Sequence, residues 1–254
     1  MKKLMIAAAA TLCAAVGFSD GVASTGVTSV NTVGYTTTTL ADDSQAVACG
    51  FIEVGGSGIN LTSIKPEADG TCNGDIYIEM LNSAGYTTDT YYWYQNARGM
   101  EDGWYNDDGD KIGDDVEDIT FTPGTGLWLT GIEDNTMTTA GQVYSSDLSI
   151  TLQDDSQMLG NPYAAPIGLA ANIEVEADGT CNGDIYIEML NSAGYTTDTY
   201  YWYQNARGME DGWYNDDGDL IGDDVEDITF PAGTGLWVSG LDGALFNITS
   251  PIVL

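Results

Sequence analysis

Apolar and polar side chains alternate along residues 75–81, where Ile76 and Ile78 fall on one side, as they do in a strand with one buried face. Residues 82–85, Asn-Ser-Ala-Gly, are typical of a turn. Residues 87–95 are rich in Thr, Tyr and Trp, which favour pleated strands. The pattern therefore predicts a β-hairpin.

Short strands and turns recur along the rest of the chain. Residues 103–105, 127–129 and 148–152 are predicted strands, and Gly109 is suited to the positive φ of a turn between them. Strands at a spacing of about 8–12 residues predict an all-β fold, a sandwich or barrel of antiparallel strands. Short helical turns are expected in only two places, residues 61–68 and 169–177.

A long internal duplication divides the chain. Residues 67–110 and 176–219 are identical letter for letter, and the match resumes beyond a single change, Lys111 against Leu220. A period of about 110 residues is the size of a domain rather than of a solenoid repeat. The sequence therefore predicts two tandem homologous β domains, repeat one over 34–144 and repeat two over 145–254.

The N-terminus has the pattern of an export signal. Lys2 and Lys3 precede an apolar stretch over 4–16, and the small residues Gly17 and Ser19 follow it. The stretch is too short for a membrane anchor, which needs about 20 apolar residues. Cys13 follows a leucine, which disfavours lipidation. We expect a signal peptide over 1–19, an extension over 20–33, and a secreted, extracellular or cell-surface protein, with the periplasm as the alternative.

Charge and composition limit the classes of partner that the protein can bind. The chain carries 39 acidic and 6 basic residues, a formal net charge of −33. Such a surface repels phosphate backbones and anionic lipids, so we expect no nucleic-acid partner and no membrane insertion after signal cleavage. Hydrophobic residues make up 43% of the chain, which is enough for a buried core rather than a disordered polymer.

The chain contains no histidine, which removes His-based triads and most catalytic zinc sites. Paired carboxylates could still hydrolyse glycosides. With 39 acidic residues, however, any such pair is expected by chance. We therefore predict that the protein is not an enzyme, with a carboxylate-based glycoside hydrolase as the less favoured reading.

Aromatic residues gather on the second hairpin strand and on the short strand that follows it. On a strand, Tyr91 and Trp93 face one way, whereas Tyr92 and Tyr94 face the other. One face belongs to the core, and the other either forms an exposed stripe that contacts sugars or a partner, or is buried by sheet packing. The contact candidates are Tyr91, Trp93, Trp104, Tyr200, Trp202 and Trp213.

Acidic and amide side chains cluster on the loop after residue 105 in each repeat. Calcium takes six to eight oxygen ligands, commonly from a loop that bends at a glycine. The spacing fits an EF-type loop only in part, because Trp104 occupies the first ligand position. The favoured alternative is a hairpin turn with acids in water. The calcium candidates are Asn106, Asp108, Asp110, Asp114, Asn215, Asp217, Asp219 and Asp223.

Three cysteines remain after export, namely Cys49, Cys72 and Cys181. An odd number leaves one thiol unpaired or paired between chains. A Cys49–Cys72 bond would lie within repeat one, and a Cys72–Cys181 bond would join the repeats. The sequence does not choose between them.

Several short motifs resemble a known kind of surface protein. Residues 159–167 read Leu-Gly-Asn-Pro-Tyr-Ala-Ala-Pro-Ile, and residues 231–238 read Pro-Ala-Gly-Thr-Gly-Leu-Trp-Val. With the Ile-Tyr-Ile and Tyr-Tyr-Trp-Tyr segments between them, they resemble a β-sandwich-like module of secreted, multi-copy surface proteins of Bacteroidota. The leader and the Val-Gly-Tyr-Thr-Thr entry at Val33 resemble small exported repeat proteins of Verrucomicrobiota and Lentisphaerota. The resemblance implies an extracellular structural or adhesive role and carries no catalytic residues.

Two functions follow from these observations. The first is an acidic structural protein of the cell surface or matrix that assembles with other copies of itself. The second is a carbohydrate-binding or adhesive module that uses exposed aromatic residues on surface glycans.

Overall fold

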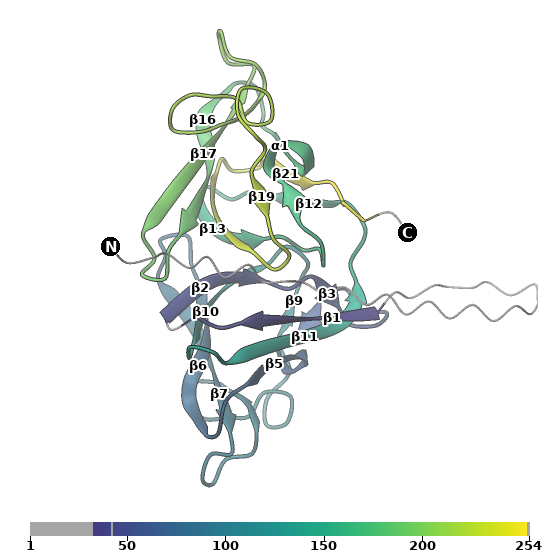
Figure 1. The fold of residues 1–254 in the computed structure, drawn as a ribbon, viewed down its shortest axis with the longest axis vertical. Coiled ribbons are helices and arrows are strands. Elements are labelled where there is room, and N and C mark those ends of the chain that lie inside the picture. Colours follow the sequence, from purple (N-terminus) through teal and green to yellow (C-terminus); the bar gives the residue numbers. More distant parts are fainter. Residues whose placement is uncertain (1–32, 42, 253–254) are drawn as a thin grey trace, which may run out of the picture.

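The computed structural model describes residues 33–41 and 43–252, and nearly all of its regular structure is β. The named strand pairs are all antiparallel, which confirms the prediction of an all-β, antiparallel fold (Figure 1). The helical turns expected near residues 61 and 169 are η1 (Leu61–Ser63) and α1 (Leu169–Asn172), each shorter than predicted. The predicted signal peptide and most of the extension lie outside the described residues.

Repeat one contains two main sheets and a small two-stranded one. The first sheet has the order β1-β11-β3, with β5 also paired to β11, and the second has the order β2-β10-β6-β7-β8. Strands β4 and β9 form the small sheet. The strands are β1 (Val33–Thr39), β2 (Asp43–Ala48), β3 (Phe51–Ile52), β4 (Ile59–Asn60), β5 (Ile64–Glu67), β6 (Cys72–Leu81), β7 (Thr87–Gln95), β8 (Gly103–Tyr105), β9 (Thr120–Phe121), β10 (Gly126–Gly131) and β11 (Thr136–Val143).

Repeat two has a similar arrangement, but one of its main sheets has three strands where the corresponding sheet of repeat one has four. Its five-stranded sheet has the order β13-β20-β16-β17-β18, its second sheet the order β12-β21-β15, and β14 pairs with β19. The strands are β12 (Leu148–Thr151), β13 (Asp155–Gly160), β14 (Ile167–Gly168), β15 (Ile173–Glu176), β16 (Cys181–Leu190), β17 (Thr196–Gln204), β18 (Gly212–Tyr214), β19 (Thr229–Phe230), β20 (Gly235–Gly240) and β21 (Leu245–Ile248).

The predicted hairpin is the pair β6–β7, and its turn contains Gly85 at a φ of 76°. The register shifts between Met80 and Leu81, and also between Asn73 and Ile76, where Gly74 has a φ of 89°. A residue with a side chain is strained in that conformation, so the glycine permits the bulge. Beyond it, Ile76 and Ile78 point to the buried side as the alternation predicts.

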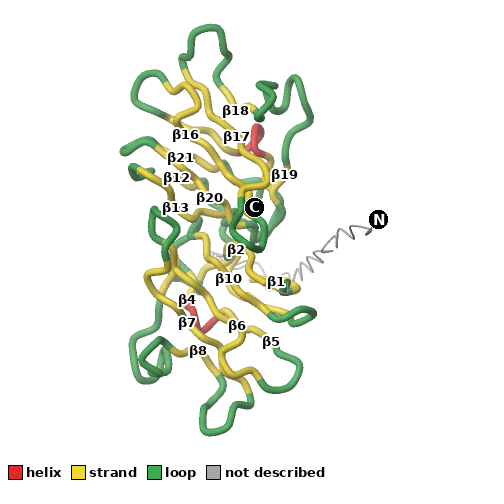
Figure 2. The backbone as a smooth tube through the Cα atoms, turned by 90° about the vertical axis from the view of Figure 1, so that its left-hand side faces the viewer, coloured by secondary structure: helices red, strands yellow, loops and turns green. Residues whose placement is uncertain are grey.

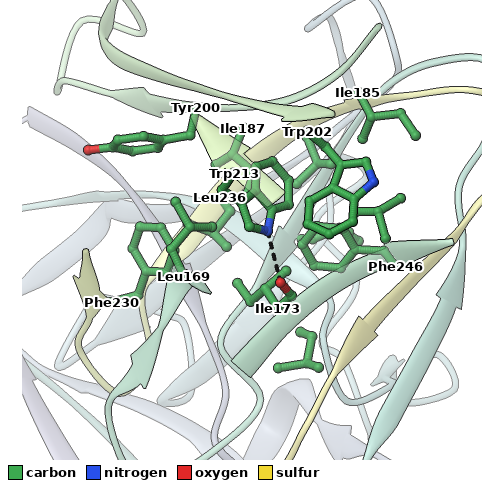
Figure 3. Close-up of a cluster of buried hydrophobic side chains, with 14 of the residues drawn as sticks. Leu169, Ile173, Ile185, Ile187, Tyr200, Trp202, Trp213, Phe230, Leu236 and Phe246 are labelled. Atoms are coloured by element: carbon green, nitrogen blue, oxygen red, sulfur yellow. Dashed lines mark hydrogen bonds between the residues drawn. The ribbon is translucent and has the colours of Figure 1, made fainter. Parts of the chain in front are cut away.

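Each repeat has its own cluster of buried side chains, drawn from both of its main sheets. In repeat two, Trp213 is 1% exposed and its indole Nε1–H donates to the carbonyl oxygen of Ile173 at 2.8 Å (Figure 3). In repeat one, Trp104 donates in the same way to the carbonyl oxygen of Ile64 at 2.7 Å. A tryptophan bonded across to the opposite sheet therefore lies in each core.

The two repeats meet through an approximate twofold contact, with one repeat stacked on the other (Figure 2). The amide of Ala48 donates to the carbonyl oxygen of Gly233 at 2.8 Å, and the amide of Gly160 donates to the carbonyl oxygen of Gly124 at 3.0 Å. Ala48 and Gly160 end equivalent strands, β2 and β13, so the two hydrogen bonds are reciprocal. This reciprocity is what an isologous interface produces.

Close backbone approach at this contact requires glycine. A Cβ added to Gly160 would overlap the Cβ of Ala48 and lie 2.8 Å from the carbonyl oxygen of Thr234. A Cβ on Gly235 would lie 2.7 Å from the backbone of Ala46 and Val47. The small residues at the ends of these strands therefore permit the two sheets to touch.

One segment breaks the symmetry. Asn161 is fully buried, and its Nδ2 lies within hydrogen-bonding distance of three carbonyl oxygens, including that of Ala165 at 2.9 Å. The loop that it holds places Ala164 of repeat two in the buried cluster of repeat one. Repeat one has Cys49 and Gly50 at the corresponding place. The loop therefore makes the contact between the repeats asymmetric.

Candidate functional site

The aromatic residues predicted to contact a ligand lie in the cores. Trp104 and Trp213 are 1% exposed, and the others are at most 9% exposed. They share the face of the five-stranded sheet that carries the buried isoleucines, and that face packs against the second sheet of the repeat. These six side chains, Tyr91, Trp93, Trp104, Tyr200, Trp202 and Trp213, are thus buried rather than part of an exposed stripe, and their contact with a ligand stays a prediction.

The opposite face of the same strands carries the accessible aromatic rings. Tyr77, Tyr92 and Tyr94 are partly exposed, and the rings of Tyr77 and Tyr92 lie 5.9 Å apart. Burial, and then a hydrogen bond with Asp107, raise the pKa of Tyr92. The aromatic strand β7 therefore has one buried face and one partly exposed face, and tyrosines form the partly exposed face.

The calcium candidates of repeat one are not brought together. Within residues 33–41 and 43–252, no group of three or more acidic or cysteine side chains is placed to hold a metal ion. The side-chain oxygen of Asn106 accepts the amides of Asp108 and Asp110 at 3.1 and 2.8 Å, which closes the turn. Asp114 pairs with Lys111 at 2.8 Å.

Repeat two has the same turn without the lysine. Asn215 accepts the amide of Asp219 at 2.8 Å, whereas Asp217 and Asp223 are exposed. Leu220 replaces the lysine whose pKa, in repeat one, is raised by the carboxylates of Asp114 and Glu101. In both repeats the loop is thus a turn closed by an asparagine side chain, and calcium binding there stays a prediction.

The three cysteines of the described chain are free and buried. The thiols of Cys72 and Cys181 each donate to a carbonyl oxygen at 3.2 Å, those of Trp93 and Trp202. Burial raises the pKa of Cys49 to about 12, partly opposed by a hydrogen bond from Thr139. Neither disulfide considered from sequence, Cys49–Cys72 or Cys72–Cys181, is present in the described chain: Cys72 and Cys181 occupy equivalent places in separate cores, and Cys49, in the same buried cluster as Cys72, is a free thiol.

A groove of about 580 Å³ lies between the repeats, and we call it the inter-repeat groove. Side chains from β6, β7 and β10 line one half, and their equivalents from β16, β17 and β20 line the other. Six pairs of equivalent residues lie in its wall, namely Glu79 and Glu188, Leu81 and Leu190, Ala84 and Ala193, Gly85 and Gly194, Thr87 and Thr196, and Trp128 and Trp237.

The tryptophans reach the groove because they alternate with core leucines. In β10, Leu127 and Leu129 are buried in repeat one, so Trp128 between them faces the other way. Trp128 is 9% exposed, and its equivalent Trp237 is more open. Each tryptophan lies opposite a glutamate on the neighbouring strand, Trp128 beside Glu79 in β6 and Trp237 beside Glu188 in β16.

The two glutamates are held by hydroxyl groups. The Oγ1 of Thr87 donates to Oε1 of Glu79 at 2.6 Å, and the Oγ1 of Thr196 donates to Oε1 of Glu188 at 2.7 Å. One oxygen of each carboxylate is thereby fixed, while the other can accept a hydrogen bond from a ligand. The groove thus presents two indole rings and two oriented carboxylates.

The hairpin turns close the ends of the groove. The Oγ of Ser83 in repeat one donates to Oδ2 of Asp155 at 3.5 Å, and the Oγ of Ser192 in repeat two donates to Oδ2 of Asp43 at 3.3 Å. Asp43 and Asp155 have φ values of 105° and 81°, where a non-glycine residue is strained. Both strained aspartates therefore lie where one repeat reaches the other.

Sequence reasoning missed Trp128, Trp237, Glu79 and Glu188. The signal for the tryptophans was present, since a Trp between two strand leucines lies on the face opposite the core. The approach of the two repeats was not encoded in any local pattern, because it depends on small residues far apart in the chain.

The described residues contain no helix that is both long and apolar enough to cross a membrane. No protein-family model, curated protein or solved structure matches this chain.

Proposed function

We propose that this chain is an exported, acidic cell-surface protein that binds a segment of neutral glycan in the inter-repeat groove. The observation that carries the proposal is the pairing of Trp128 with Glu79 and of Trp237 with Glu188 in one concave surface. Ligand sites are generally concave and combine aromatic walls with a few oriented polar groups.

The chemistry of the groove suits sugars. A pyranose ring has an apolar face that packs on an aromatic ring, and hydroxyl groups at its edge that donate to carboxylates. The net charge of −33 disfavours uronic or sulfated polymers. A neutral glycan is therefore the expected ligand, and we assign the two glutamates to hydroxyl binding rather than to hydrolysis.

The proposal also covers the location of the protein and its domain organisation. The export signal read over residues 1–19 directs the protein to the cell surface or the extracellular space. We take each repeat, 34–144 and 145–254, as a β-sandwich-like domain of its own, supported by a separate buried cluster in each. The groove then lies at a domain interface, where ligand sites commonly occur.

A structural role through self-assembly is the second candidate. Its support is the exposure of large apolar rings outside the groove wall, with Tyr86 and Tyr195 each 72% exposed on the hairpin turns and Tyr35 63% exposed on β1. Exposed aromatic residues are typical of contact surfaces. Light scattering of the full chain tests it, and a strict monomer at millimolar concentration would remove it.

Isothermal titration tests the glycan proposal directly. The full mature chain is titrated with hexasaccharides of β-1,4-glucan, β-1,4-mannan, β-1,4-xylan and chitin, and with a galacturonic acid hexamer as the anionic control. At least one neutral hexamer is expected to bind, with affinity reduced about tenfold or more in Trp237→Ala.

The matched control is Tyr35→Ala, which removes an exposed aromatic residue from the other sheet of repeat one. It is expected to bind as wild type does. Binding of none of the four neutral hexamers, or equal binding by Trp237→Ala, would remove the proposal.

A further inference from the structure

The partly exposed tyrosines form a continuous extension of the inter-repeat groove. Tyr77 and Glu79 stand two residues apart in β6 and so project from the same side of the strand. Glu79 lines the groove. Tyr77 is therefore the next position outward on the same surface.

From Tyr77 the surface continues across the sheet in register. Tyr77 lies opposite Tyr92 in β7, and Tyr92 lies opposite Tyr105 in β8. Adjacent strands are about 4.8 Å apart, so the two steps from Tyr77 in β6 to Tyr105 in β8 cover about 10 Å. That is the length of a short oligosaccharide beyond the groove itself.

The rings are fixed in place by their neighbours. Tyr94 packs edge-on against Tyr105 with ring centres 5.2 Å apart, and Tyr105 is 6% exposed with its hydroxyl donating to the carbonyl oxygen of Glu101. Tyr92 is hydrogen-bonded to Asp107. A fixed aromatic surface loses little conformational entropy when a ligand packs on it.

Repeat two carries the same surface. Tyr186 and Tyr201 have ring centres 5.9 Å apart, and Tyr203 packs on Tyr214 at 5.1 Å. We define the tyrosine faces as Tyr77, Tyr92 and Tyr94 in repeat one and Tyr186, Tyr201 and Tyr203 in repeat two. Because the repeats are related by an approximate twofold, the faces extend the groove on its two opposite sides.

We infer that the binding surface is longer than the groove and that its ligand is a polymeric neutral glycan, with the two tyrosine faces contributing equally as outer subsites. This inference rests on the proposed function. The approximate twofold has a further consequence. A polysaccharide chain has a direction, whereas the surface presents the same subsites in the same order from either end.

Chain length is the variable that tests this inference. The full mature chain is titrated with each of the four neutral series, from disaccharide to octasaccharide. Affinity is expected to keep rising from tetrasaccharide to octasaccharide. Tyr77→Ala and Tyr186→Ala are each expected to weaken octasaccharide binding about fivefold and by similar factors, and to leave tetrasaccharide binding within about twofold of wild type.

Two controls separate ring loss from misfolding. Tyr77→Phe and Tyr186→Phe keep the ring and are expected to bind the octasaccharide as wild type does, and the far-UV circular dichroism of all four variants should be unchanged. Affinity that stops rising at the tetrasaccharide, or alanine variants that bind the octasaccharide normally, would overturn the inference.

The outcomes distinguish this inference from the proposed function. If short glycans bind and Trp237→Ala abolishes that binding, the groove stands whatever the length series shows. If long chains bind through the tyrosines while Trp237→Ala has no effect, the faces stand and the groove assignment falls.

Discussion

Replacing Trp213 by phenylalanine tests the assignment of the buried tryptophans to the core. The change removes the Nε1–H that donates to the carbonyl oxygen of Ile173 at 2.8 Å. A buried carbonyl left without its partner costs about 1–3 kcal/mol. The space vacated by the smaller ring adds about 1 kcal/mol. The expected loss in the free energy of unfolding is therefore about 2–4 kcal/mol.

Trp104→Phe is the matched variant in repeat one. Its indole donates to the carbonyl oxygen of Ile64 at 2.7 Å, and its ring packs beside Trp93 at 5.4 Å, compared with 5.3 Å for Trp213 beside Trp202. Because the surroundings are nearly the same, the two losses should agree within about 1 kcal/mol.

Urea unfolding followed by far-UV circular dichroism measures both losses without relying on tryptophan emission. Trp237→Phe, in the groove wall, is the control and should cost less than about 1 kcal/mol, because that side chain is partly exposed. A loss below about 1 kcal/mol in both core variants would refute the structural assignment, and so would a larger loss in the groove variant.

Three further predictions concern the contact between the repeats, the pH dependence of stability, and Leu220, which stands where the first copy of the duplicated stretch has Lys111. Gly160→Ala should lower the free energy of unfolding by about 1–3 kcal/mol in urea, because its Cβ would overlap that of Ala48; unchanged stability would contradict the packed contact. Cys49 has its pKa raised from 9.0 to about 12, so its protonated form is favoured in the folded state, and stability should be full below pH 9 and fall by about 1.4 kcal/mol per pH unit up to about 12. Stability should fall less steeply with pH in Cys49→Ala than in the wild type. Equal slopes of melting temperature against pH in the two proteins, measured from pH 8 to 11, would contradict this prediction. Leu220→Lys places a lysine where repeat one has Lys111, which forms ion pairs with Glu101 and Asp114. Because ion pairs on the surface contribute little, the substitution should change the free energy of unfolding by less than about 1 kcal/mol. A shift in the urea midpoint equivalent to about 2 kcal/mol would contradict this prediction.

Local patterns predicted the strands well because each strand has one buried face. The alternation around Ile76 and Ile78 marked β6, and the residues 87–95 proposed as a strand are the bounds of β7. Turn chemistry was equally local, since Gly85 and Gly109 both have positive φ values. These features need only neighbouring residues to be specified.

The face of the aromatic strand could not be assigned from sequence. Both sides of β7 carry large rings, so its pattern does not say which side meets the second sheet. The isoleucines of β6 decide it, because the register places Tyr91 opposite Ile78 and Trp93 opposite Ile76. The aromatic residues proposed from sequence as ligand contacts therefore lie on the buried face of the sheet.

The inter-repeat groove also could not be predicted from the local sequence pattern. It depends on the contact of Ala48 and Gly160 from different repeats, and on the hairpin turns reaching across to Asp43 and Asp155. Neither feature has a signature in sequence beyond small residues and short acids. The sequence left the cysteine pairing open, and the structure has three free thiols, with Cys49 and Cys72 in one buried cluster and Cys181 in the other.

A crystal structure of the full mature chain with its tightest-binding neutral octasaccharide tests the central claim most directly. The account predicts sugar rings stacked between Trp128 and Trp237, with hydroxyl groups donating to Glu79 and Glu188. Sugar bound elsewhere on the protein, with the groove filled only by water, would contradict it.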